Sequence, residues 1–161
     1  MDVRFALKRQ FLGSLAMLRQ CIERCPEAVW EAGPHPRNFW RIAYHAIFYA
    51  DLYMQQSVEL HRAWPKSDET ARVLWEEPPV IPAYSKADLL DYLDQVMQAV
   101  SPTVDGLDLE REETGFDWYP NMSKIEHLLV NLRHIQGHVG QLSERLIAEG
   151  VDVDWVARRD P

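Results

Sequence analysis

The sequence predicts an all-α protein, a four-helix bundle that occupies residues 1–161 as a single domain. Apolar residues recur at spacings of three and four in four long segments, and no segment alternates as a β-strand would. Most prolines and glycines lie between these segments. The hydrophobic fraction of 47% can bury one face of each segment, and helices without strands bury those faces against one another.

The first two helices are expected at residues 2–25 and 38–64. Asn38 is the expected N-cap of the second helix, and Pro65 is expected to end it. The second helix is apolar almost all round as far as Asp51, which predicts that it lies inside the bundle. The inward stripe of the first helix consists of Leu7, Phe11, Ser14, Leu15, Leu18, Ile22 and Cys25.

The third and fourth helices begin with capping signals. Ser85 is followed three residues later by Asp88, and Ser123 by Glu126, a spacing typical of a capping box. The third helix is expected to weaken at residues 101–102, and the fourth to continue to Gly150. The expected core positions are Leu89, Leu93, Val96, Met97 and Val100, followed by Ile125, Leu128, Leu129, Leu132, Ile135, Val139, Leu142 and Leu146.

Three connecting segments are expected to lack regular structure. Residues 65–84 contain four prolines, and a long loop of this kind often covers a site. Residues 102–121 form a second irregular stretch, and residues 151–161 an extended tail packed by Trp155. The side chains that could cover an opening of the bundle are Trp75, Val80, Ile81 and Tyr84.

The charge balance argues against nucleic acid as a partner. Seventeen basic and 25 acidic residues give a net charge of −8, and no cluster of Lys and Arg offers a surface for phosphates. No signal peptide and no apolar run of transmembrane length is recognisable, which predicts a cytoplasmic protein without membrane contact. Cys21 and Cys25, four residues apart, are expected to be small buried apolar residues rather than a disulfide.

Histidines provide the only grouping that suggests chemistry. His134 and His138 are four residues apart on the fourth helix, so their Cβ atoms should lie about 6 Å apart, close enough for both rings to bind one ion. His127 lies about 10 Å further along the axis, too far to share that ion. Such a pair also arises by chance, and two solvated or core histidines are the alternative.

His45 lies in the middle of the most apolar helix, where a buried imidazole requires a partner. A core histidine with one hydrogen bond is one interpretation. If the second and fourth helices face each other, a metal ion shared with His134 and His138 is the other. Three neutral imidazoles plus solvent are typical of a catalytic zinc site, and imidazole also binds nickel, iron or manganese. Tyr49, Asn131 and Gln141 could hydrogen-bond to the ligands or to a substrate, or could be ordinary polar residues.

The segments WRIAYHAIFYADLYM around His45 and NLRHIQGHVGQL around His134 and His138 resemble the DinB-like superfamily of metal-binding four-helix bundles. GFDWYPNMSKIEH and YSKADLL resemble one branch of it, and the likeness covers residues 3–150. The resemblance implies an up-up-down-down topology, one divalent ion on the three histidines, and often a homodimer. His127 departs from the pattern and is expected at most to contact the ligands or line the pocket.

The resemblance also implies a class of reaction, because the family includes enzymes that act with small thiols. The first hypothesis is a metal-dependent thiol S-transferase or related hydrolase, with a small-molecule thiol and an electrophile as partners. The second is a non-catalytic stress or ligand-binding protein in which the metal has a structural or sensing role. The third is an interaction module that binds no ion. The sequence leaves open whether the protein is an enzyme.

Overall fold

The computed structural model describes residues 2–161, and within that range all regular structure is helical. The expected all-α class is therefore confirmed. The helices are α1 (Val3–Arg24), α2 (Glu27–Trp30), α3 (Phe39–Met54), the 3-10 helix η1 (Val58–Leu60), α4 (Lys86–Gly106) and α5 (Lys124–Ala148). The short helix α2 was not expected. None of the helices described is long and apolar enough to cross a membrane.

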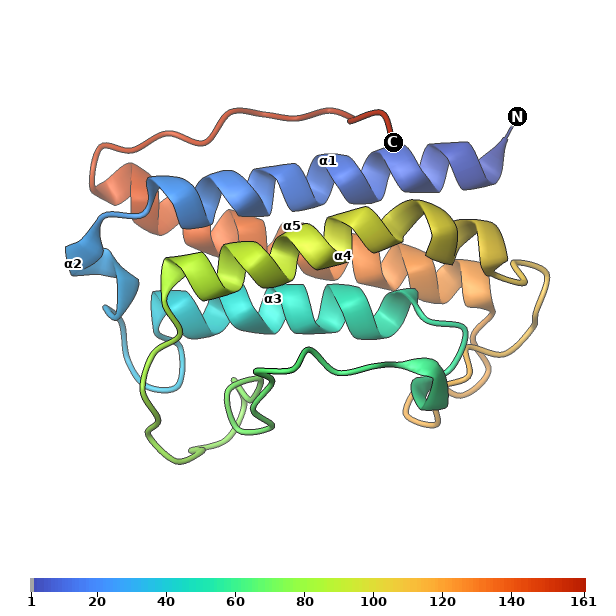
Figure 1. Cartoon of the computed structure of the whole chain (residues 1–161), viewed down its shortest axis with the longest axis horizontal. Coiled ribbons are helices and arrows are strands. Elements are labelled where there is room, and N and C mark those ends of the chain that lie inside the picture. Colours follow the sequence, from blue (N-terminus) through green and yellow to red (C-terminus); the bar gives the residue numbers. More distant parts are fainter. Residues whose placement is uncertain (1) are drawn as a thin grey trace.

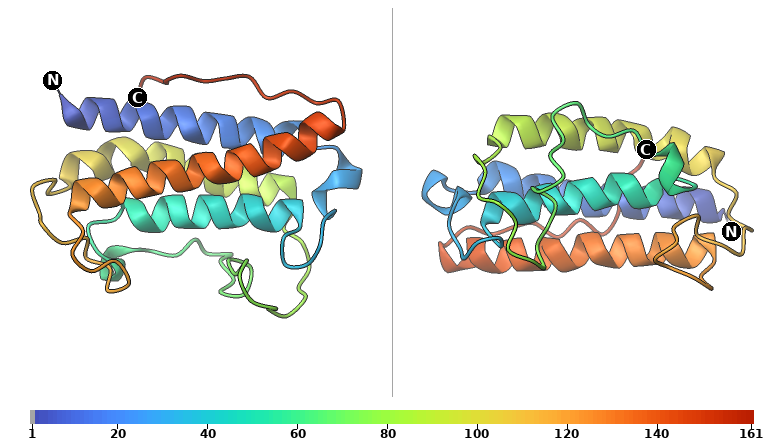
Figure 2. Two further views of the ribbon diagram at one scale, coloured as in Figure 1. Left: turned by 180° about the vertical axis from the view of Figure 1, so that it is seen from behind. Right: turned by 90° about the horizontal axis from the view of Figure 1, so that it is seen from below.

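The four long helices lie side by side around one hydrophobic core (Figures 1 and 2). Helices α1 and α3 each pack along α4 and α5, so α1 and α3 face each other only across the core. The residues of α3 are buried almost without exception, which confirms the interior position expected for this helix. The bundle therefore holds any polar side chain on α3 away from bulk solvent.

The expected up-up-down-down order of the helices is wrong. Helix α1 runs antiparallel to α3 and α4 and parallel to α5, an up-down-down-up order (Figure 1). The contacts agree, because Lys8 pairs with Asp105, whereas Cys21 lies beside Ser143. Parallel neighbours need a connection that travels the length of the bundle, and residues 55–85 provide it between α3 and α4.

Three of the four long helices begin at a side-chain cap. Asp2 accepts a hydrogen bond from the amide of Phe5, and Ser85 accepts one from Asp88. At α5 both bonds of the expected capping box are present between Ser123 and Glu126. Such caps satisfy amides that have no partner within the helix, so they define where a helix starts.

Asn38 stands at the expected N-cap position of α3 but does not cap the helix. Its side-chain amide instead donates hydrogen bonds to the backbone carbonyls of Glu31 and Gly33. Asn38 therefore stabilises the turn that precedes α3.

Helix α3 ends at Met54, ten residues before the expected end at residue 64. Gln55 has an extended backbone, and its carbonyl accepts a hydrogen bond from the Lys124 ammonium. Beyond it, the amide of Val58 donates to the carbonyl of Gly115. Tertiary hydrogen bonds to residues 107–124 thus replace the helical ones, and Pro65 is not the residue that ends the helix.

Helix α4 continues through Pro102 to Gly106, whereas an irregular stretch was expected from residue 102. Val100 and Val104 are fully buried and extend the inward stripe past the proline. The last turn is also held to α1, because the guanidinium of Arg4 donates to the carbonyl of Leu107. These contacts offset the helical hydrogen bond that proline removes.

Most of the expected inward stripe of α5 is confirmed, since Leu128, Ile135, Val139, Leu142 and Leu146 are buried and Leu132 is partly buried against the core. The expectation is wrong for Leu129, which is 54% exposed, and Ile125 is only half-buried.

The tail beyond Gly150 is extended, as expected, and lies along α1 (Figure 2). Trp155 does not pack it, since this side chain is 75% exposed. The tail is held instead by hydrogen bonds, including those of Gln20 and Arg24 with the backbone of residues 152 and 154.

Candidate metal centre

Three histidines from two antiparallel helices meet at one point. His45 lies in the middle of α3, and His134 and His138 lie one turn apart on α5. The Nε2 atom of His134 is 3.1 Å from Nε2 of His45 and 3.1 Å from Nε2 of His138. One ligand atom from each residue lies within 4.8 Å of the others. The two helices therefore join residues that are 89 positions apart in the sequence.

Hydrogen bonds on the outer side of two rings determine where their protons lie. His45 Nδ1 is 2.6 Å from the backbone carbonyl of Arg72, which can only accept. His138 Nδ1 is 3.0 Å from the side-chain carbonyl oxygen of Gln141. In each neutral ring the proton is therefore on Nδ1, and the lone pair is on Nε2 and directed at the common point.

The arrangement leaves the three rings without a complete set of hydrogen bonds among themselves. Two Nε2 lone pairs face Nε2 of His134, which carries at most one proton to share between them. His134 Nδ1 is buried and has no partner. Nitrogen ligands about 2.1 Å from one tetrahedral ion lie about 3.4 Å apart, close to the spacing observed here. The three imidazoles therefore fit a divalent cation.

The environment keeps these histidines neutral, which is the form that binds a metal ion. Burial, together with the nearby His138, lowers the pKa of His45 to about 3. Burial likewise lowers the pKa of His134 to about 4. The pKa of His138 is also lowered by burial, against an opposing contribution from its hydrogen bond to Gln141.

Of the other residues named from the sequence, Tyr49 and Gln141 adjoin the three histidines. The ring centroid of Tyr49 is 4.6 Å from that of His45 and 5.6 Å from that of His134. Gln141 contacts His138 as described above. Asn131 is fully buried between helices, where its amide donates to the carbonyl of Ala50 and its side-chain oxygen has no partner.

His127 lies apart from the three rings, as its spacing predicts. It is fully buried, and its ring centroid lies 4.8 Å from that of Tyr53 and 4.6 Å from that of Phe116. Neither ring nitrogen has a hydrogen-bond partner. Burial lowers its pKa to about 4, and the neighbouring Lys124 lowers it further. His127 thus packs behind the wall of the pocket as a neutral ring.

A pocket of about 540 Å³ opens beside His45 and His134. Trp75 of the 65–84 connection borders it, whereas Val80 of the same segment is 83% exposed and covers nothing. Several lining residues were not identified from the sequence, because nothing in the sequence places them next to the histidines, although some of them lie in the segments that resemble the family. Those residues are Tyr53, Arg72, Val73, Trp118 and Tyr119. The aromatic run at residues 116–119 was the one available signal.

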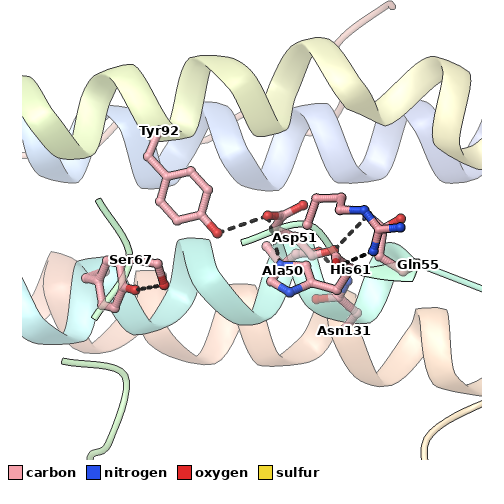
Figure 3. A network of polar contacts seen from close by, with 9 residues as sticks. Ala50, Asp51, Gln55, His61, Ser67, Tyr92 and Asn131 are labelled. Atoms are coloured by element: carbon pink, nitrogen blue, oxygen red, sulfur yellow. Dashed lines mark hydrogen bonds and ion pairs between the residues drawn. The ribbon is translucent and has the colours of Figure 1, made fainter. Parts of the chain in front are cut away.

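A second polar group lies on another face of α3 (Figure 3). The hydroxyl of Tyr92 donates to Oδ2 of Asp51 at 2.9 Å, and Nε2 of His61 lies 3.2 Å from the same oxygen. Figure 3 shows Tyr92 reaching Asp51 from α4, and Asn131 approaching Ala50 from α5. Tyr92 and His61 therefore share one acceptor, the carboxylate of Asp51, and this group is complete without a ligand.

Comparison with known proteins identifies one family. The family model described as the DinB superfamily matches residues 10–142, which include all three histidines, the whole of α3 and most of α5. No curated protein and no solved structure shows a significant match to the chain.

Proposed function

From the premise that this chain belongs to the DinB superfamily, we propose that it binds one divalent metal ion on His45, His134 and His138. With that ion, the protein acts as a metal-dependent thiol S-transferase that uses a small thiol. The observation that carries the proposal is that the Nε2 atoms of the three histidines converge on one point. The hydrogen bonds at Nδ1 of His45 and His138 leave the Nε2 lone pairs of these two rings directed at that point. Zinc is the first choice of ion, because three imidazoles with an open position are its usual catalytic set; nickel, iron and manganese also suit imidazole.

An ion held there would lower the pKa of a small thiol or a water molecule and so supply a nucleophile near neutral pH. The chain itself offers no alternative thiolate. Cys21 and Cys25 are buried, and burial raises the pKa of Cys25 to about 11 and that of Cys21 above its usual value. The nucleophile would therefore come from a bound small molecule rather than from the protein.

The chain's own residues would orient the site and receive the electrophile. The carbonyl of Arg72 and the side chain of Gln141 hold two rings in one tautomer. The aromatic pocket beside His45 and His134 would receive the second reactant and keep bulk water away from it. A homodimer, implied by the family resemblance, belongs to the same proposal and is testable by analytical ultracentrifugation.

A non-catalytic role is favoured by one observation, the position of the ligands on two different helices. An ion that bridges His45 of α3 and His134 of α5 would hold these helices together. On this alternative the metal would raise the melting temperature, and no thiol would be consumed.

The decisive experiment is elemental analysis of purified protein after incubation with each of the four metals. We expect a stoichiometric amount of one ion in the wild type and a loss of most of it in His134→Ala. His35→Ala is the matched control, since His35 is an exposed histidine that does not belong to the three that meet. Equal, low metal content in wild type and His134→Ala would contradict both the enzyme and the structural alternative.

A thiol-conjugation assay then separates the two roles. Wild type loaded with metal is mixed with several small thiols and an aromatic chloride, and loss of the thiol is followed with time. Conjugation that requires both metal and His134 supports the transferase. Stoichiometric metal without conjugation of any thiol favours the non-catalytic role.

A further inference from the structure

The pocket beside the three histidines has mainly aromatic walls. Five of its nine lining residues are Tyr or Trp, and Val73 is the one aliphatic residue among them. Among the described residues that line it, none carries a carboxylate. The lining residues other than Val73, His45 and His134 are Tyr49, Tyr53, Arg72, Trp75, Trp118 and Tyr119.

Three of these rings contact one another and present both faces and edges. Tyr49 and Tyr53 lie one turn apart on α3, with ring centroids 5.1 Å apart. The ring of Tyr119 stands edge-on to Tyr53 at 5.7 Å, and the two hydroxyl groups lie 3.4 Å apart. Aromatic faces and edges of this kind bind flat aromatic rings in preference to branched aliphatic groups.

Arg72 supplies the one permanent positive charge in the lining. Its Nε is buried and donates no hydrogen bond, and one terminal nitrogen pairs with Glu69 at 2.7 Å. Glu69 is 86% exposed and does not line the pocket, so solvent screens this pair. The backbone carbonyl of Arg72 accepts the hydrogen bond of His45. The side chain of Arg72 lines the pocket together with His45 and Tyr49, and its guanidinium lies over the ring of Phe48, 5.1 Å from the ring centroid.

An aromatic pocket can also bind a cation, so the charge of the ligand has to be decided. Arg72 repels a cation in this pocket, and a divalent ion on the histidines would add to that repulsion. An anion is attracted by both and meets no lining carboxylate. We propose that the pocket takes a planar aromatic molecule with one anionic group, and that Arg72 recognises the anion. This inference rests on the proposed function, since it names the substrate class of the same site.

The test uses three ligands that share one aromatic body. Wild-type protein stripped of metal by dialysis against a chelator is titrated calorimetrically with 2-naphthoate, 2-naphthamide and 2-naphthylmethylammonium. We expect the carboxylate to bind about tenfold more tightly than the amide, because a hydrogen bond to a charged group adds about that factor. The ammonium compound should bind least tightly.

Two variants separate the charge from the aromatic walls. Arg72→Gln should remove the preference for carboxylate over amide, and Arg62→Gln, an exposed arginine outside this pocket, should keep it. Trp118→Ala should weaken the binding of the carboxylate and of the amide by a similar factor. Trp118 is 50% exposed, so its replacement leaves the core intact.

The inference is overturned if the amide or the ammonium compound binds wild type as tightly as the carboxylate, if no naphthalene ligand binds, or if the preference survives in Arg72→Gln. None of these outcomes depends on metal. The proposed function fails separately, through the metal content of the wild type.

Discussion

Two buried polar groups on α3 differ in whether the number of hydrogen-bond donors matches the number of acceptors. Around Asp51, the hydroxyl of Tyr92 and the ring of His61 both meet one carboxylate oxygen (Figure 3). Around His45, two imidazole lone pairs face a third imidazole, and Nδ1 of His134 has no partner at all. The first group is complete within the protein, whereas the second has more hydrogen-bond acceptors than donors. Several lone pairs that converge on one point without enough donors indicate a binding site, whereas a single unpartnered atom, as in His127 or Asn131, does not.

The largest expected effect comes from removing the acceptor in the complete group. Asp51→Ala should lower the free energy of unfolding by about 3 kcal/mol, because two buried donors lose their partner. Asp51→Asn keeps an oxygen acceptor and should cost less. Urea denaturation measures both. Metal uptake should be unchanged, and a loss of metal in Asp51→Ala would contradict the separation of the two groups.

The histidine group should respond to metal instead. At an ion concentration 100 times the dissociation constant, binding should add about 2.7 kcal/mol to the stability of wild type. His134→Ala should show no such gain, and His35→Ala should behave as wild type. Thermal unfolding with and without metal measures the difference. A metal-dependent gain that persists in His134→Ala would place the ion elsewhere.

A smaller effect is expected from the residue that orients His138. Gln141→Ala removes the acceptor of the Nδ1 proton and should weaken metal binding about tenfold. Gln141→Glu keeps an acceptor at that position and should restore most of the affinity. Competition with a chromogenic chelator measures both constants. Equal affinity in wild type and Gln141→Ala would mean that this hydrogen bond does not orient the ligand.

Lys124 is a third buried polar group, and its ammonium donates hydrogen bonds to the backbone carbonyls of Gln55 and Thr114. Burial lowers its pKa from 10.5 to about 8, with a further contribution from the charge of Arg111. The unfolded chain therefore binds more protons between these two values, and stability rises with pH in that window. Below pH 8 both states are protonated, and the cost of burial is constant.

Comparison with Lys124→Met isolates this effect from the titration of tyrosines and cysteines. The stability of wild type relative to the variant should rise by about 1 kcal/mol from pH 8 to pH 9. Denaturation at pH 7, 8 and 9 measures the change, and little change is expected from pH 7 to 8. A constant difference across all three values would mean that the lysine keeps its ordinary pKa.

The accuracy of the sequence-based expectations depended on the range of the interactions involved. The capping box at Ser123 was predicted correctly, because both of its partners lie within four residues. The spacing of His134 and His138 predicted two neighbouring rings for the same reason. The exposure of Leu129 and of Trp155 was not predicted, because each depends on which surface another element covers.

What the sequence by itself determined is the set of local structures: the helical class, the caps at Ser85 and Ser123, most of the inward stripes and the pair of histidines one turn apart on α5. Only the tertiary structure decided the end of α3 at Met54, the directions of the helices and the aromatic pocket with Arg72. The physical reason is that a helix and its cap form from contacts within one or two turns. The approach of His45 to His134, by contrast, depends on how whole helices pack across 89 positions.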